Sequence, residues 1–156
     1  MNNTTAHVKH RLAIALRRVL SGESKTRYKA GQQFLQYLGT SPKEFRVFVQ
    51  KRLQPEFTLS NYGKVWVLDH VAPLFLFDQT SEDDLAVCWN FINVIPMPLL
   101  LNRLKGVSLD FTLTELEIRA IEFPNNPAIA ALKNRTIDFV RSMKKYHSKT
   151  CSVVRA

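Results

Sequence analysis

The chain is poor in cysteine, and this limits the kinds of site that it can build. Its 156 residues include two cysteines, Cys88 and Cys151, and no Cys-x-x-Cys pair. A zinc site with four cysteine ligands is therefore excluded within one chain, and we expect no structural zinc. Two widely separated cysteines also give no sign of a disulfide framework, which favours a reducing compartment.

Long hydrophobic runs, internal repeats and low-complexity segments are also missing. No apolar run approaches the ~20 residues that a transmembrane helix needs. Arg17 and Arg18 interrupt the apolar stretch near the N-terminus, where a signal peptide would need its core. We therefore expect a soluble, intracellular protein with no membrane partner. A hydrophobic fraction of 46% over this length predicts one compact domain with one core.

Acidic residues are the scarcer charged type, with 13 Asp and Glu against 22 Lys and Arg and a net charge of +9. The excess is uneven: residues 1–54 hold 11 basic residues against 2 acids, residues 55–132 hold 4 against 10, and residues 133–156 hold 7 against 1. Basic ends attract a phosphate backbone, and a local acidic excess favours a divalent cation. The ordinary alternative is that the basic runs are solvated helix faces.

Apolar spacing, capping residues and breakers predict an α+β fold that is mostly helical. Strands are expected over residues 64–72 and 91–95, with Pro96 ending the second. Predicted helix caps are Ser41, Ser81, Thr114 and Asn126. The predicted helices cover residues 6–20, 30–38, 42–53, 82–90, 98–105, 115–121 and 127–146, followed by a basic tail that we expect to be disordered.

The stretch from residue 66 to residue 106 carries polar residues at separations that suit a single metal site. They are Asp69, His70, Asn93, Asn102 and Lys105. A neutral histidine can take a proton from water near neutral pH, while Asp69 and Asn102 offer the oxygen ligands that Mg²⁺ prefers. Strand alternation points Asp69 and His70 to different sides unless the strand curls. Taken singly, the histidine reads as an ordinary core or surface residue and the asparagines as turn or cap residues.

Together, several segments resemble the HNH endonuclease family, of the ββα-metal type with phage and viral members. The resemblance covers residues 38–106. Its segments are Leu-Gly-Thr-Ser-Pro-Lys-Glu-Phe (38–45), Asn-Tyr-Gly-Lys-Val-Trp-Val-Leu-Asp-His-Val-Ala-Pro (61–73), Phe-Asp (77–78), Asn-Val-Ile-Pro-Met-Pro (93–98) and Asn-Arg-Leu-Lys-Gly (102–106). Departures from the family pattern at Val94, Ile95, Met97 and Pro98 concern packing more than chemistry.

The resemblance implies a role for each polar residue. Asp69 corresponds to the first metal ligand, His70 to the general base and Asn102 to the second metal ligand. Asn93 corresponds to the middle asparagine, which hydrogen-bonds backbone across the motif loop and holds the histidine. Lys105 is a candidate phosphate contact and Arg103 a weaker one. The implied cofactor is one divalent metal ion, Mg²⁺ or alternatively Mn²⁺, and the implied products carry 5′-phosphate and 3′-hydroxyl ends.

This interpretation divides the chain into three regions: residues 1–54 as a basic helical DNA-binding region, 55–106 as the HNH nuclease core, and 107–156 as a C-terminal helical region with a basic tail. Further DNA contacts are predicted at Arg17, Arg18, Arg46, Lys51 and Arg52. The alternative for the helix over residues 42–53 is a core helix with a solvated basic side. The acids at 82–84 fit helix N-terminal charges better than a second metal site, and His7, His10 and His147 are expected to be surface residues.

The predicted function is therefore metal-dependent endonucleolytic cleavage of DNA, with a monomer that nicks one strand. One alternative is a DNA-binding protein that keeps the nuclease fold without cutting. Another is a dimeric nuclease acting on branched DNA, although nothing in the sequence indicates a homodimer.

Overall fold

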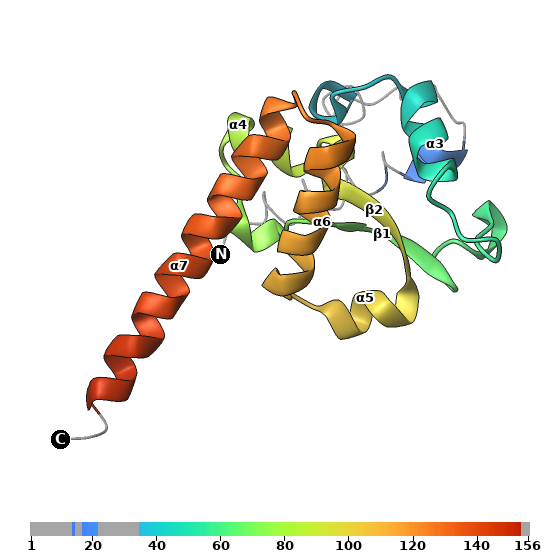
Figure 1. Cartoon of the computed structure of the whole chain (residues 1–156). Helices are drawn as coiled ribbons and strands as arrows, with labels where there is room; N and C mark the ends of the chain where they lie inside the picture. Colours follow the sequence, from blue (N-terminus) through green and yellow to red (C-terminus); the bar gives the residue numbers. More distant parts are fainter. Residues whose placement is uncertain (1–13, 15–16, 22–34, 154–156) are drawn as a thin grey trace.

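A two-stranded antiparallel sheet lies at the centre of the molecule, with helices packed around it (Figure 1). The computed structural model describes residues 14, 17–21 and 35–153, with side chains as far as residue 144. The fold is α+β and mostly helical, as predicted. Strand β1 (Trp66–His70) pairs with β2 (Val94–Pro98), in a register that runs from Trp66 opposite Pro98 to His70 opposite Val94.

The second strand lies later in the chain than predicted, and the expectation that Pro96 ends it was wrong. Phe91–Asn93 forms a 3-10 turn (η3) instead. At the two ends of β2, the Asn93 carbonyl accepts from the Val71 N–H and the Leu99 N–H donates to the Val65 carbonyl. The odd-numbered residues therefore turn their backbone polar groups toward β1. Pro96 and Pro98 therefore occupy alternate positions where a backbone N–H would point away from β1, so proline loses no ladder bond in this edge strand.

Three of the four predicted capping residues stand where a helix begins. In α3 (Pro42–Gln50) the capping box predicted at Ser41 and Glu44 is present, and Ser81 caps α4 (Glu82–Cys88). The remaining elements are η1 (Leu59–Asn61), η2 (Leu74–Leu76), α5 (Leu99–Lys105), α6 (Leu109–Glu122) and α7 (Pro127–Val153). The predicted start at Thr114 was wrong: Ser108 caps α6, and Thr114 lies inside the helix with its hydroxyl bonded to the Asp110 carbonyl at 3.1 Å.

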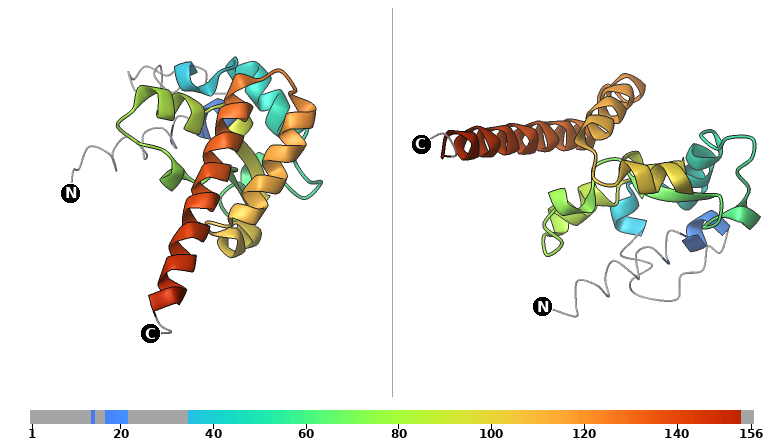
Figure 2. Two further views of the ribbon diagram at one scale, coloured as in Figure 1. Left: turned by 60° about the vertical axis from the view of Figure 1, so that its left-hand side comes forward. Right: turned by 90° about the horizontal axis from the view of Figure 1, so that it is seen from below.

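The last helix is longer than predicted and extends well beyond the rest of the molecule (Figures 1 and 2). Asn126 accepts a hydrogen bond from the Ala128 N–H at 3.0 Å, as expected of a capping residue. The helix continues to Val153, through residues that were expected to form a disordered tail. Among its described side chains, Ile129 and Leu132 belong to the hydrophobic core.

One hydrophobic core joins residues from most of these elements. Its fully buried members include Trp66 of β1, Val94 of β2, Phe45 of α3 and Leu116 of α6. Of the first two predicted helices, residue 14 and residues 17–21 and 35–38 are helical, and the remainder lies outside the described residues. None of the described helices is long and apolar enough to cross a membrane.

Candidate functional site

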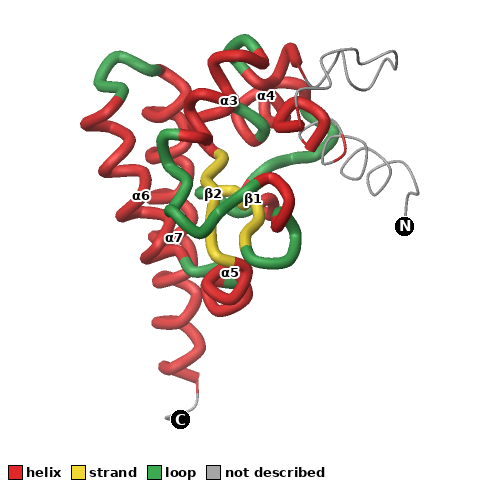
Figure 3. The backbone as a smooth tube through the Cα atoms, turned by 90° about the vertical axis from the view of Figure 1, so that its right-hand side faces the viewer, coloured by secondary structure: helices red, strands yellow, loops and turns green. Residues whose placement is uncertain are grey.

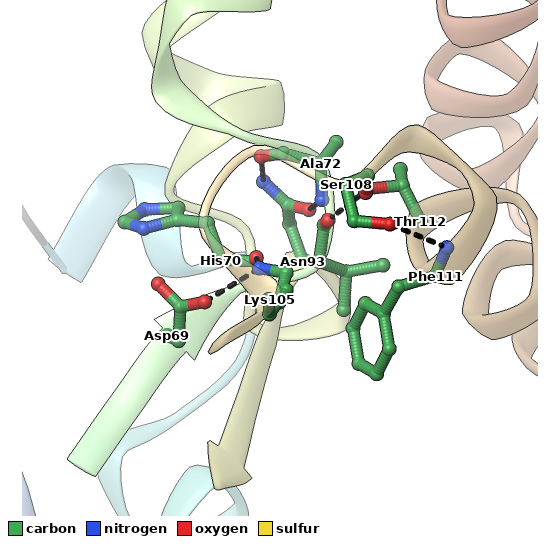
Figure 4. Close-up of polar contacts among 9 residues, drawn as sticks. Asp69, His70, Ala72, Asn93, Lys105, Ser108, Phe111 and Thr112 are labelled. Carbon is green, nitrogen blue, oxygen red and sulfur yellow. Dashed lines mark hydrogen bonds and ion pairs between the residues drawn. The ribbon is translucent and has the colours of Figure 1, made fainter. Parts of the chain in front are cut away.

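Asn93 makes three buried hydrogen bonds at the candidate site. Its side chain is fully buried at the end of η3, immediately before β2. Oδ1 accepts a hydrogen bond from the Ala72 N–H at 2.7 Å, and Nδ2 donates to the carbonyls of Ala72 and Cys88 at 3.3 and 2.8 Å. These are cross-loop hydrogen bonds of the kind expected for this asparagine, and they fix the backbone that follows His70 (Figure 4).

The carbonyls of the same loop are held from the helical side as well. The hydroxyl of Thr112, a fully buried residue of α6, donates to the Val71 carbonyl at 2.8 Å. The Val71 N–H donates in turn to the Asn93 carbonyl at 2.8 Å. The loop that leaves β1 is thus tied to η3 on one side and to α6 on the other. Because buried backbone groups are costly when unpaired, this bonding keeps the loop in one conformation.

Lys105 contacts Asp69 and does not face outward as a phosphate contact would. Its Nζ lies 2.5 Å from Asp69 Oδ2 and 2.6 Å from the His70 carbonyl oxygen. The Lys105 side chain is 3% exposed, against 24% for Asp69. The ammonium also lies 5.2 Å from the ring centroid of Phe111. A phosphate could reach this lysine only if the ammonium left Asp69.

His70 points away from this ion pair, as expected for the neighbour of Asp69 on a strand (Figure 4). Its ring packs edge-to-face against Trp89, with the centroids 4.7 Å apart. Nε2 is buried and has no hydrogen-bond partner among the described residues. Burial lowers the pKa of His70 to about 4; the Asp69 carboxylate opposes this and the Lys105 ammonium adds to it. His70 is therefore a neutral imidazole at neutral pH.

The residues available to a cation are few and chemically simple. Among the described residues no group of three His, Cys, Asp or Glu side chains could hold a metal ion. Asn102 stands three residues before Lys105 on α5, so the two are neighbours along one side of the helix. One carboxylate and one amide oxygen suit Mg²⁺, which keeps several waters and takes few ligands from the protein. The donor set and the unpartnered His70 nitrogen fit a site of this kind.

The other predicted DNA contacts lie on several elements. Figures 1 and 3 show α3 above and α5 below the sheet, so the basic residues of α3 are separated from Arg103 of α5. Lys51 is exposed on one wall of an open groove beside Phe48. Arg52 lies over the Phe48 ring at 3.9 Å and is paired with Glu122, so its charge is partly neutralised.

The remaining predicted contacts differ in how far they reach solvent. Arg17 is exposed and lies 5.4 Å from the Tyr62 ring centroid, whereas Arg18 is half-buried. Arg46 of α3 is half-buried, and Arg103 is exposed.

Three parts of the site were not foreseen from the sequence: the Lys105–Asp69 ion pair, the contact of Thr112 with the loop, and the packing of Trp89 on His70. For Lys105 the sequence offered one indication that it belongs to the site: it stands three residues from Asn102, on the same side of the predicted helix. Thr112 gave none, since its role depends on how α6 crosses the sheet. A buried arginine, Arg119, was also missed. Burial lowers its pKa to about 10.

No protein-family model matches the chain, and no solved structure matches it. The chain is similar to an uncharacterized protein, L426, of Acanthamoeba polyphaga mimivirus, with 31% identity over 81 residues. That match covers 50% of the chain and 36% of the viral protein.

Proposed function

We propose that this protein is a metal-dependent DNA endonuclease of the HNH type. The observation that carries the proposal is the arrangement around the loop after β1. Asn93 holds that loop by hydrogen bonds on both edges, while Asp69, His70 and the inner face of α5 surround it. Two paired strands followed by α5, with α4 between the strands, support the ββα core that we propose.

Each side chain has a separate task in this proposal. His70 is neutral at neutral pH and takes a proton from the water that attacks phosphorus. Its Nε2 has no hydrogen-bond partner among the described residues, so no neighbouring group there competes for that nitrogen. Asp69 and Asn102 would hold a divalent cation, which neutralises charge on the phosphate and on the leaving oxygen. Asn93 positions His70 through the backbone of Ala72.

A nicking assay on supercoiled plasmid tests the proposal. We expect nicks with Mg²⁺ or Mn²⁺, none with EDTA, and ends that carry 5′-phosphate and 3′-hydroxyl groups. His70→Ala should lower the nicking rate at least a hundredfold, the lower range for loss of a general base, and leave the Kd for DNA nearly unchanged. Asn125→Ala, an exposed site on the turn before α7, serves as the matched control. Full activity of His70→Ala in Mg²⁺ would contradict the assignment.

A second candidate function is DNA binding without cleavage. The observation that favours it is the ion pair itself, because the Lys105 ammonium already neutralises the Asp69 carboxylate. DNA binding in a gel-shift assay, with no nicking under any metal, would support this candidate over the nuclease.

A further inference from the structure

A positive charge already occupies the position where a nuclease of this kind needs a cation. The Lys105 ammonium contacts Asp69 Oδ2 and the His70 carbonyl at 2.5 and 2.6 Å, in a pocket that leaves the lysine side chain 3% exposed. Taking an ammonium out of water costs several kcal/mol unless its partners are well placed. Both partners here belong to the strand end that carries the proposed site.

The local charge balance makes this lysine and a metal ion compete for the same carboxylate. Asp69 is the carboxylate of the proposed site, and the described residues offer no group of three acidic, histidine or cysteine ligands there. One carboxylate balances one ammonium. A divalent cation beside an undisplaced ammonium would leave the pocket with an uncompensated charge of about +2, and like charges at such short range repel strongly in a partly buried site.

We infer that Lys105 is a built-in counter-ion of Asp69 and that a divalent cation binds by displacing it. The lysine thereby weakens metal binding to the DNA-free protein. This inference rests on the proposed function and assigns Lys105 a role in that site, namely setting its affinity for metal. DNA phosphate supplies the negative charge that receives the released ammonium, so DNA and metal strengthen each other's binding.

Metal binding without catalysis tests the inference. The Kd for Mn²⁺ would be measured by isothermal titration calorimetry in DNA-free wild type and in two variants. Lys105→Met removes the charge and keeps an unbranched side chain against Phe111, whereas Lys105→Arg keeps the charge. We expect Lys105→Met to bind Mn²⁺ at least tenfold more tightly than wild type, and Lys105→Arg to resemble wild type.

A second arm adds an uncut DNA duplex to proteins that carry His70→Ala. The duplex should tighten Mn²⁺ binding at least tenfold when Lys105 is present, and much less in the Lys105→Met background. A merely structural lysine would not produce this difference.

A measurement on the wild-type protein tests the inference even if Lys105→Met does not fold. In wild-type protein the Lys105 ammonium should give a ¹⁵N–¹H cross-peak, because its buried protons exchange slowly. The peak, identified by its loss in Lys105→Arg, should disappear or shift when Mg²⁺ is added. An unchanged peak at saturating Mg²⁺ would overturn the inference.

The outcomes separate the inference from the proposed function. If wild type nicks plasmid with Mn²⁺ but Lys105→Met binds Mn²⁺ no more tightly, the inference fails and the nuclease assignment stands. If wild type neither nicks nor binds Mn²⁺, and Lys105→Met binds none either, both fail.

Discussion

His70 shows how strongly the environment of one side chain changes its chemistry. A histidine in water has a pKa of about 6.5, and the sequence alone gives no reason to expect another value. In the folded chain its Nε2 is buried beside Trp89, and burial lowers its pKa to about 4. The imidazole is therefore unprotonated at neutral pH, and holding a proton costs more free energy than it would in water.

The stability of the metal-free protein should reflect this burial. Because the folded pKa lies below the unfolded one, the unfolded state binds more protons between about pH 6.5 and pH 4. Unfolding free energy is unaffected above this window and falls as the pH drops through it, by up to about 3 kcal/mol from this group. The free energy of unfolding of wild type and of His70→Gln would be measured by urea unfolding in EDTA at pH 7.5 and pH 4.5.

Other carboxylates titrate in the same range, so the difference between the two proteins is the relevant quantity. The stability advantage of wild type over His70→Gln should shrink by about 2–3 kcal/mol at pH 4.5. A difference that stays constant with pH would mean that His70 is not buried as a neutral ring.

Asn93 and Lys105 mark what could be foreseen about single residues. The hydrogen bonds of Asn93 were expected because its role is local: it ties a loop to the start of the adjacent strand. The position of Lys105 depends on how α5 packs on the end of β1. The spacing of residues along the sequence shows which other residues lie on the same helix face as a lysine. It does not show which carboxylate of another element that face contacts.

At the scale of elements, caps were predicted well and strand limits poorly. Ser41, Ser81 and Asn126 begin their helices as expected, because a cap acts on the backbone two or three residues away. The limits of β2 could not be predicted from the sequence. Pro96 and Pro98 are acceptable in this strand because their backbone nitrogens point away from β1, and the sequence does not show on which side the partner strand lies. Thr114 resembled a cap, but Ser108 starts the same helix six residues earlier.

Gly39 precedes α3 and lies against the turn that leads into Asn93. Its φ is +70°, and a Cβ at this position would lie 2.4 Å from Nδ2 of Asn90, the residue that caps η3. Gly63 has a similar φ of +81°, but a Cβ added there would meet no atom within 4 Å. Gly63 is therefore a matched control for backbone strain alone.

We expect Gly63→Ala to lower the unfolding free energy by about 1 kcal/mol, the cost of a left-handed conformation, and Gly39→Ala to lower it by at least twice as much. Urea unfolding monitored by tryptophan fluorescence would provide both values. In an Asn90→Ala background the extra cost at Gly39 should disappear. Equal effects of the two single substitutions would show that Asn90 yields without strain.

For the whole molecule, the fold class was foreseen from the sequence, but the arrangement of the charges was not. The basic residues proposed to bind DNA fall on separate elements, and some of them are already partnered. Lys105 is paired with Asp69 and Arg52 with Glu122. Arg17, Lys51 and Arg103 are exposed, and they come from three separate parts of the chain. The total of 22 Lys and Arg therefore overstates the number of basic side chains that are free to meet phosphate.

The salt dependence of DNA binding should separate specific contacts from net charge. Each phosphate contact contributes about 0.9 to the slope of log Kd against log salt concentration. Replacing Arg17, Lys51 and Arg103 by Gln should therefore reduce that slope by about 3, measured by fluorescence anisotropy of a labelled duplex in EDTA. A control with the same net charge carries Glu in place of Thr114, Ile118 and Ile121, which are exposed on α6. We expect the control to keep nearly the wild-type slope, because α6 supplies none of the proposed phosphate contacts. Equal losses in the two triple variants would mean that DNA responds to the overall charge and that these three residues are not its contacts.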